Sequence, residues 1–383
     1  TTPNICIGYV NQSLCTPCYG PPVPTQWPAA SPSALAMSVV AGQTFQTVVT
    51  PPSLPVDGNC TAARFGEIIK LAFDPYNRLV FVYDTTYLVI RAINVTDPSN
   101  CSVWTFYGDG TASATPVYGT GTNAKLGNWM TGFVFDTRLR KLIVGMGISS
   151  LTNYWATAFS IDPLTGQAEY LFGNRSYCDG LQSDSLMPPP VIGTGESAAF
   201  CGAFTAFYTL SSFNAIYHPP SGRVYWSVGI STYGTQPYQA APFYSVNNSI
   251  VGIVLNSTGG LGTHGLCAPE YSSSLDRIYY SCSNNSGSIN VPMYIYVFNN
   301  VTSRLEFAFT VPSPLDAWLF SGQQLILGSD FYASSSYAYP YTRTTGRGTT
   351  YTFPVANYTG VTPIARNGPD YYASLVDYPE RDV

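Results

Sequence analysis

The sequence predicts an all-β fold, a β-propeller made of four-stranded antiparallel blades. Three observations lead to this prediction. One strand-turn-strand phrase recurs along the chain, further strands follow most copies of it, and Gly and Pro interrupt every candidate amphipathic helix. Self-similarity at a spacing of tens of residues is typical of propellers and solenoids. Five blades are visible in this way.

The recurring phrase joins an apolar strand through a short polar turn to a second, aromatic-rich strand. The copies cover residues 71–82, 132–144, 215–226, 270–280 and, more faintly, 318–327. A basic or polar residue opens the second strand of each copy, and these residues are Arg78, Lys141, Arg223, Arg277 and Gln324. The phrase predicts the two inner strands of each blade.

Two further strands are expected after each of the first four copies. They are predicted at 87–93 and 103–107, 155–161 and 168–172, 243–246 and 250–255, and 293–298 and 304–310. Four antiparallel strands in a unit of about 45–60 residues match a propeller blade. A single blade exposes both of its faces, so each blade must pack against its neighbours.

The chain is expected to divide into a Cys- and Pro-rich connector, residues 1–33, and a propeller, residues 34–383. The strand 34–42 would complete the last blade as its outer strand. The chain begins with Thr1 and not with Met, which we interpret as a mature or trimmed N-terminus.

Composition excludes two classes of partner. Only 10% of the residues are charged, the net charge is −5, and no basic run occurs, so nucleic acid is not expected as a partner. No apolar stretch approaches 18 residues, and no membrane span is expected. With so few charges, the surface depends on Ser, Thr, Asn, Gly and Tyr, and would gain solubility from glycans.

The sequence contains ten Asn-x-Ser/Thr sequons, none with Pro in the middle position. About four would arise by chance at this composition, so N-glycosylation of most of them is expected. The asparagines are Asn11, Asn59, Asn94, Asn100, Asn174, Asn247, Asn256, Asn284, Asn300 and Asn357. The alternative is that loops rich in Ser, Thr and Asn produce sequons without glycans.

Nine cysteines also indicate an oxidising compartment. The expected disulfide pairs are Cys60–Cys101, Cys178–Cys201 and Cys267–Cys282. The second pair would close a Gly/Pro/Ser-rich insertion at 179–199, and the third would bridge a hairpin. The remaining Cys6, Cys15 and Cys18 predict a small disulfide knot with one thiol paired elsewhere, because no further ligands follow at zinc spacing.

Part of the chain resembles the repeat of NHL-type propellers. The resemblance rests on Val40-Ala-Gly42, Ala63-Arg-Phe-Gly66, Ala72-Phe-Asp74, Leu79-Val-Phe-Val-Tyr-Asp84 and Ile90-Arg-Ala-Ile93, with the inter-blade phrase repeated at 107–110 and 124–127. It covers about residues 38–147 and decays afterwards, where the Asp ending the second strand is lost. The resemblance implies six blades, the sixth being divergent, assembled from the two ends, or absent.

No catalytic, metal or cofactor site is expected. The two histidines, His218 and His264, fit a hairpin turn and a Gly-rich loop better than a shared metal site. The carboxylates Asp74, Asp136, Asp162 and Asp276 fall at or beside tight turns, where Asp accepts local backbone N–H bonds. Covalent N-glycans are the only added groups expected.

A Tyr-rich segment at 332–341 is the expected interaction loop. Its residues are Tyr332, Tyr337, Tyr339 and Tyr341, followed by Arg343 and Arg347. Tyr and Arg are enriched at protein interfaces. A long crossover inside one blade is the equally weighted alternative.

The expected function is that of a secreted, non-enzymatic glycoprotein acting as an assembly or interaction unit of an extracellular filament, coat or matrix, for example a mastigoneme-like filament. Its partners would be other extracellular subunits, including copies of itself. The first alternative is a ligand-binding ectodomain for a peptide or glycan. The second is a propeller enzyme of the lyase or strictosidine synthase-like type.

Overall fold

The structure, a computed structural model of the chain, is an all-β propeller. The chain divides into the units Thr1–Ala36 and Met37–Val383, and every described strand belongs to the second. The structure describes residues 40–42, 54–66, 68–111, 113, 117–127, 129–149, 154–178, 189–200, 215–226, 242–255, 267–272, 276–283, 293–311, 317–321, 324–329, 349–354 and 362–365. The expected boundary between residues 33 and 34 stays a prediction, because it lies outside these ranges.

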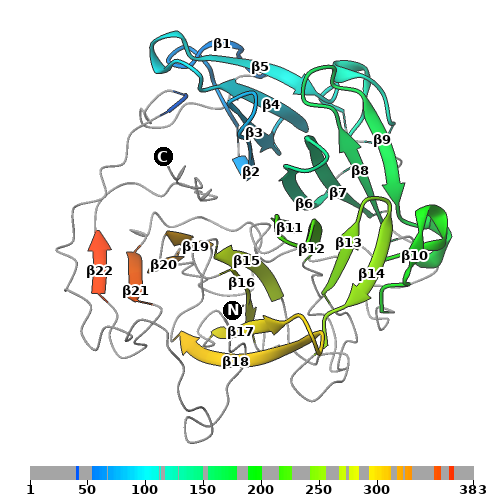
Figure 1. Ribbon diagram of the computed structural model, residues 1–383. Helices are drawn as coiled ribbons and strands as arrows, with labels where there is room; N and C mark the ends of the chain where they lie inside the picture. Colours follow the sequence, from blue (N-terminus) through cyan, green and yellow to red (C-terminus); the bar gives the residue numbers. More distant parts are fainter. Residues whose placement is uncertain are drawn as a thin grey trace, which may run out of the picture. The chain divides into compact units, whose positions relative to one another are not determined.

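The first sheet has the strand order β1-β5-β4-β3-β2 (Figure 1, blue and cyan). Its strands are β1 (Gly58–Asn59), β2 (Ile68–Asp74), β3 (Leu79–Asp84), β4 (Val89–Asn94) and β5 (Ser102–Tyr107). β2 to β5 follow one another as antiparallel neighbours. β1 comes from the loop before the blade and pairs with the outer strand β5. Two residues carry too little periodicity for sequence reasoning to have found β1.

The second and third sheets repeat this plan. The second contains β6 (Trp129–Asp136), β7 (Lys141–Ser149), β8 (Tyr154–Ile161) and β9 (Ala168–Phe172) in that order. The third contains β10 (Gly193–Thr194), β11 (Ala215–His218), β12 (Arg223–Trp226), β13 (Phe243–Val246) and β14 (Ser249–Ile253). Its short strand β10 pairs with the outer strand β14, as β1 does with β5.

The fourth and fifth sheets have four strands each, in chain order. They are β15 (Cys267–Ser272), β16 (Arg277–Ser283), β17 (Met293–Asn299) and β18 (Arg304–Val311), then β19 (Ala317–Ser321), β20 (Gln324–Ser329), β21 (Thr349–Pro354) and β22 (Thr362–Ala365). Consecutive sheets contact each other through their first strands, β2 with β6, β6 with β11, β11 with β15, and β15 with β19. The predicted fold class is confirmed, and the described residues contain five of its sheets.

The expected outer strand at 34–42 is described only in its last three residues. Residues 41 and 42 form a bend there and not a strand. Gly42 has a positive φ of 93° and donates its N–H to the carbonyl of Cys60. The strand prediction is therefore wrong for this end of the segment, because glycine in that conformation turns the chain.

The turn between the first two strands has four residues in each of the first four sheets. Its last residue adopts the left-handed conformation, with φ between 48° and 63°, at Arg78, Arg140, Gly222 and Asp276. This conformation reverses the chain so that pairing resumes at the next residue. Arg78 is thus equivalent to Arg140 and not to Lys141. The basic side chains of the sequence copies therefore do not mark the same position, and the first copy is shifted by one residue.

A similar loop precedes each of the first three sheets. Isolated bridges join Val56 to Arg64, Val117 to Lys125, and Val191 to Ala199. A fully buried alanine occupies the same place in each loop, at Ala63, Ala124 and Ala198. The third loop lies inside the segment 179–199 expected to be an insertion. The second half of that segment is therefore a regular part of the blade. The first two loops end in Gly66 and Gly127, whereas the third has Cys201 at that place, so its sequence does not reveal the repeat.

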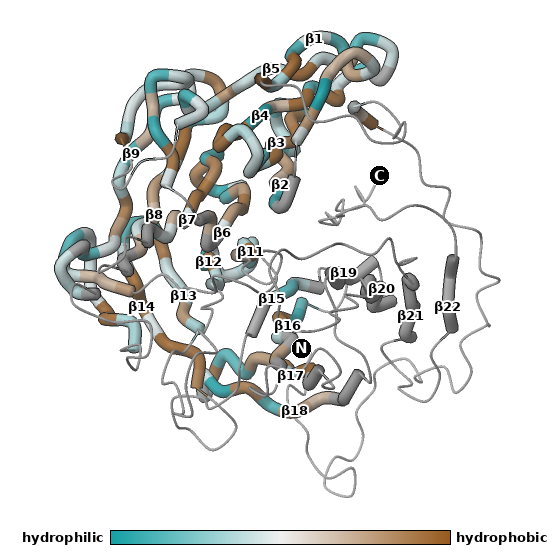
Figure 2. The backbone as a smooth tube through the Cα atoms, turned by 180° about the vertical axis from the view of Figure 1, so that it is seen from behind, coloured by the Kyte–Doolittle hydropathy of each residue, from teal (hydrophilic) through white to brown (hydrophobic). Residues whose placement is uncertain are grey.

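The core lies between successive sheets, and both faces of the middle strands are buried. In β7, Leu142, Val144 and Met146 pack toward the first sheet, whereas Ile143 packs toward the third. Side chains of a strand point alternately to its two faces, so strands buried on both sides read as continuous apolar runs. Brown, hydrophobic residues accordingly recur along the strands of the first sheets in Figure 2.

Candidate functional site

The expected interaction loop and the N-terminal cysteines lie outside the described residues. The former comprises Tyr332, Tyr337, Tyr339, Tyr341, Arg343 and Arg347, between β20 and β21, and the latter are Cys6, Cys15 and Cys18. His264 also lies outside them. These assignments stay predictions.

One expected disulfide is confirmed, and it ties the first inter-blade loop to the outer edge of the first sheet. Cys60 and Cys101 are bonded across a sequence separation of 41. Both side chains are buried, and the N–H of Cys60 donates to the carbonyl of Cys101 at 3.1 Å. Closing a loop of this length stabilises the fold by about 4 kcal/mol in the chain-entropy model.

The other expected pairs are described in part. The register places Cys267 directly opposite Cys282, and Cys282 is disulfide-bonded. Cys178 ends the short helix η4 (Arg175–Cys178), while Cys201 lies outside the described residues. The Cys178–Cys201 pair therefore stays a prediction.

Six of the ten sequon asparagines are described, and none of them is buried. They are Asn59, Asn94, Asn100, Asn174, Asn247 and Asn300; the other four, Asn11, Asn256, Asn284 and Asn357, lie outside the described residues. In three of the six, the side-chain oxygen accepts a hydrogen bond from within its own sequon. Thr61 Oγ1 donates to Asn59, the Thr96 N–H to Asn94, and the Ser176 N–H to Asn174. In each of these bonds the acceptor is the amide oxygen and not the amide nitrogen, the atom to which a glycan would be attached.

Two further sequon asparagines connect neighbouring sheets. Asn247, between β13 and β14, accepts a hydrogen bond of 2.5 Å from Arg138 of the second sheet. Asn300, after β17, accepts one of 3.1 Å from the hydroxyl of Tyr225 in β12. The strand-end asparagines thus help hold consecutive blades together through their oxygen atoms.

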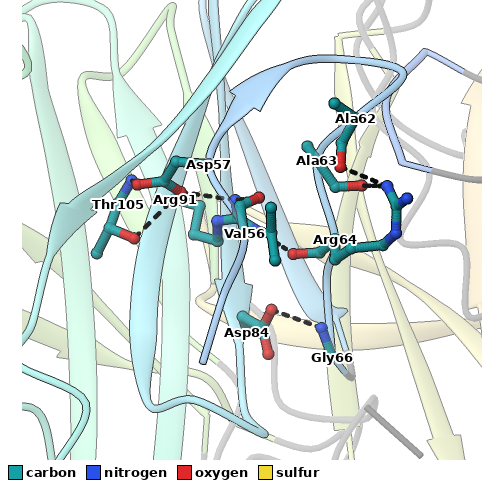
Figure 3. A network of polar contacts seen from close by, with 9 residues as sticks. All are labelled: Val56, Asp57, Ala62, Ala63, Arg64, Gly66, Asp84, Arg91 and Thr105. Atoms are coloured by element: carbon teal, nitrogen blue, oxygen red, sulfur yellow. Dashed lines mark hydrogen bonds and ion pairs between the residues drawn. The ribbon is translucent and has the colours of Figure 1, made fainter. Parts of the chain in front are cut away.

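A polar network around Arg91 fixes the first inter-blade loop (Figure 3). The guanidinium of Arg91, which is 0% exposed, lies 2.7 Å from the carboxylate of Asp57 and also donates to the carbonyls of Val56 and Arg64. Asp57 in turn accepts from the backbone and side chain of Thr105 in β5. Three donor contacts of one buried guanidinium therefore satisfy groups on both branches of the loop.

Sequence reasoning missed Arg91. The register places Phe159, Phe243 and Tyr296 at the same position in the next three sheets, each opposite the fourth residue of its second strand. Those aromatic side chains pack on the preceding sheet, whereas Arg91 stacks over the ring of Phe65, 4.4 Å from its centroid. The available signal was a lone Arg inside the apolar strand 87–93, which is unusual unless its charge is paired.

Two other charged groups are buried in the first sheet. Burial lowers the pKa of Lys70 in β2 to about 7, and β3 pairs Tyr83 directly opposite it. Burial also raises the pKa of Asp84 to about 6, against the opposing effects of the Gly66 N–H and of Arg91. Buried groups with shifted pKa values occur in active sites and in structural networks alike. Here Asp84 accepts the N–H of Gly66, at the end of the inter-blade loop, which indicates a structural role.

The turn aspartates mostly have the expected role. Oδ1 of Asp74, Asp136 and Asp162 each accepts two backbone N–H groups from the residues that follow in the turn. Asp276 differs, because it ends its turn in the left-handed conformation. Its Oδ1 lies 3.0 Å from His218 Nε2 and accepts a hydrogen bond of 3.1 Å from the Tyr271 hydroxyl. Local backbone bonds of Asp276 stay a prediction, because residues 273–275 lie outside the described residues.

His218 ends β11, directly before the hairpin turn, and is buried between the third and fourth sheets. Its Nε2 lies 3.0 Å from Asp276 Oδ1, and its Nδ1 lies 2.7 Å from Ser221 Oγ. With Asp276 ionised, Nε2–H donates to the carboxylate and Nδ1 accepts from the Ser221 hydroxyl. The ring of Tyr271 packs edge-on against the imidazole at 4.9 Å.

Ser221, His218 and Asp276 are the residue types of a hydrolase triad, but their surroundings fit a structural contact between two sheets better than a catalytic site. Tyr271 donates to the same Asp276 oxygen that His218 uses. The Gly222 N–H, next to Ser221, donates to the carbonyls of His218 and Pro219 and is not directed at a substrate oxyanion. The cluster therefore links two blades through one buried imidazole.

The described residues contain no group of three His, Cys, Asp or Glu side chains arranged to hold a metal ion. In the same part of the chain, no helix is long and apolar enough to cross a membrane.

Comparison with known proteins concerns the fold alone. No protein-family model matches the sequence, and no curated protein matches it. Among solved structures, the nidogen/laminin complex is 14% identical, with 77% of this chain and 79% of that chain covered and a TM-score of 0.37. TolB from Acinetobacter baumannii is 14% identical (76% and 53% covered, TM-score 0.41). PQQ-bound aldose sugar dehydrogenase from Streptomyces coelicolor is 9% identical (82% and 86% covered, TM-score 0.43).

Proposed function

We propose that the chain is a secreted, N-glycosylated propeller without enzymatic activity, which serves as a structural or protein-interaction unit of an extracellular filament, coat or matrix. The observation that carries the proposal is the Cys60–Cys101 disulfide, whose two cysteines each follow a sequon asparagine, Asn59 and Asn100. Disulfides persist in oxidising compartments. N-glycosylation marks surface loops of secreted proteins. Both features support the same compartment.

The surface composition supports assembly. Charged residues, at 10%, provide little repulsion between molecules, and the sequons offer glycans as the alternative source of solubility. The Tyr- and Arg-rich segment 332–347 would provide rigid contact area. The resemblance to NHL-type repeats over about residues 38–147 supports a scaffold role, and a mastigoneme-like filament is one concrete setting. The partners would be other extracellular subunits, including copies of this chain.

The experiment is secretion of the full chain from a eukaryotic cell, followed by endoglycosidase treatment and light scattering over a concentration series. We expect a mass shift on deglycosylation and an average mass that rises with concentration. Replacing Tyr337 and Tyr339 by Ser should reduce this rise, whereas Leu164→Ser, at a turn residue that is 75% exposed, should not. A chain without glycans would refute the secretory assignment, and a strict monomer would refute assembly.

A hydrolytic activity is the second candidate, favoured by the 2.7 Å and 3.0 Å contacts of His218 with Ser221 and Asp276. In that function the Ser221 hydroxyl would be the nucleophile and His218 the base. A fluorophosphonate probe tests it directly. Labelling that disappears in Ser221→Ala and persists in Ser197→Ala, at an exposed serine that ends the short helix Gly195–Ser197, would establish it.

A further inference from the structure

Three sequons meet at one end of the first sheet. Ser102, the hydroxyl residue of the Asn100-Cys101-Ser102 sequon, pairs with Asn94 of β4 on one side and with Asn59 of β1 on the other. Neighbouring strands are about 4.8 Å apart, so three acceptor asparagines surround one residue within roughly 10 Å. The sequons differ in one respect, namely where their hydroxyl residue lies.

The hydroxyl residues of Asn59 and Asn94 remain accessible in the folded protein. Thr61 and Thr96 are exposed turn residues outside the strands. Ser102, in contrast, begins β5 and is paired on both sides. The transferring enzyme must bind this hydroxyl residue in an extended chain, so the sequon of Asn100 is blocked once β1 has paired with β5.

The disulfide makes that block permanent. Cys60 precedes Cys101 by 41 residues, so Cys60 enters the secretory compartment first. When the sequon of Asn59 emerges, Cys101 has not yet entered the compartment. When the sequon of Asn100 emerges, Cys60 is already in the compartment and can form the disulfide with Cys101 at once.

We propose that glycosylation of Asn100 is limited by closure of the Cys60–Cys101 disulfide, whereas Asn59 and Asn94 are modified independently of it. This rests on the proposed secretory function. The two reactions compete for the same chain segment. Closure leaves a folded molecule with Asn100 bare, and earlier glycosylation leaves one with three neighbouring glycans.

The two competing reactions are glycan transfer to Asn100 and oxidation of the Cys60 and Cys101 thiols. In glycosylation, Nδ2 of Asn100 forms a bond to C1 of a lipid-pyrophosphate-linked oligosaccharide, the C1–O bond to the pyrophosphate breaks, and the amide loses one proton. In closure, the thiols of Cys60 and Cys101 lose two protons and two electrons, which reduce the disulfide of a thiol oxidoreductase to a dithiol.

The test is site-by-site glycan occupancy in wild type and in Cys60→Ser, measured on glycopeptides from secreted and cell-retained protein together. The substitution leaves the sequon of Asn100 unchanged, and Asn-Ser-Thr remains a sequon at Asn59. Because glycans are transferred while the chain enters the secretory compartment, a variant that never completes folding still reports occupancy. Wild type should be partly occupied at Asn100, and the unoccupied fraction should fall several-fold in Cys60→Ser.

Two controls distinguish the cause. Occupancy at Asn94 and Asn247 should not change in Cys60→Ser; the hydroxyl residue of Asn247, Ser249, is also paired on both sides but lies next to no cysteine. Cys282→Ser, which removes a different disulfide, should leave Asn100 as in wild type. Equal occupancy of Asn100 in wild type and Cys60→Ser would overturn the inference while leaving the proposed function intact. Absence of glycans at every sequon would overturn both.

Discussion

Nε2 of His218 lies 3.0 Å from Oδ1 of Asp276, and this contact links the first hairpins of the third and fourth sheets. The imidazole is buried, but the Asp276 side chain is 61% exposed. The pair is thus partly screened by solvent, and each member has a second partner, Ser221 for His218 and Tyr271 for Asp276. We infer that the His218–Asp276 contact mainly fixes how the third and fourth sheets pack together, and that it adds little to the stability of either sheet.

Replacing Asp276 should show that its contribution is made by hydrogen bonding and backbone conformation more than by charge. In Asp276→Asn the side-chain oxygen still accepts from His218, and Asn tolerates φ of 48°, so we expect a loss below about 0.5 kcal/mol. Asp276→Ala removes the one oxygen that accepts from both His218 and Tyr271, at a left-handed position, and should cost about 1–2 kcal/mol. Urea unfolding measures the difference, and equal losses would contradict this interpretation.

Gly132 should not tolerate a side chain. A Cβ at this position would lie 2.4 Å from the ring of Trp226 and 3.0 Å from Cβ of Ala215, both in the third sheet. We expect Gly132→Ala to destabilise the protein by about 1–3 kcal/mol, because the two sheets must move apart. Gly119→Ala is the control, since its nearest neighbours would lie at 3.3 Å or more. Thermal unfolding should show a clearly smaller shift for the control.

Arg91 should be replaceable neither by an apolar residue nor by lysine. Arg91→Met removes the ion pair of Asp57, which keeps its hydrogen bonds from Thr105, and the guanidinium donors to two loop carbonyls. It should cost about 3 kcal/mol, the lower end for a broken buried pair because Asp57 is 43% exposed. Arg91→Lys lacks the planar fork and should recover only part of this. Arg64→Met removes a half-buried guanidinium that donates to the neighbouring carbonyls of Ala62 and Ala63, and it should cost below about 1 kcal/mol. Equal unfolding midpoints for Arg64→Met and Arg91→Met would argue against the network.

Lys70 should make stability depend on pH above neutrality. Burial lowers its pKa from 10.5 to about 7, so between these values the unfolded chain binds more protons than the folded one. Stability should therefore rise with pH from about 7 to 10.5, and fall as pH decreases through 7. Lys70→Met should flatten this window and stabilise the protein most below pH 7. A pH series of urea unfolding curves tests this, and an unchanged slope in the variant would refute it.

Asp84 should act in the opposite direction at lower pH. Burial raises its pKa from 3.8 to about 6, so the folded state holds the proton more tightly than the unfolded chain. Its contribution to stability is fully present below about pH 4 and is lost as pH rises through 6. Asp84→Asn should remove this slope and leave the slope assigned to Lys70 unchanged. Loss of both slopes together would mean that the two groups titrate as a coupled pair.

Much of the architecture was predictable because short stretches of sequence, the apolar strands and the polar turns between them, determine it. The strand-turn-strand phrases predicted the inner strands of five sheets, and β9 and β13 begin and end at the predicted residues. The Cys60–Cys101 pair was predictable as well, since the two cysteines flank one copy of the phrase. The register error at Arg78 shows the limit of this approach, because backbone conformation and not side-chain charge defines the turn.

The functional contacts were not predictable, because they join residues far apart in the sequence. The residues around Arg91 in the sequence do not indicate its contact with the carbonyl of Val56. Those around His218 do not indicate its contact with Asp276. Each contact requires strands to pair and sheets to stack, which depends on burial over the whole blade. The sequence alone thus established the propeller class, the sequons and the cysteine content. Only tertiary packing decided which asparagines meet at Ser102 and which charges are buried, since both follow from register.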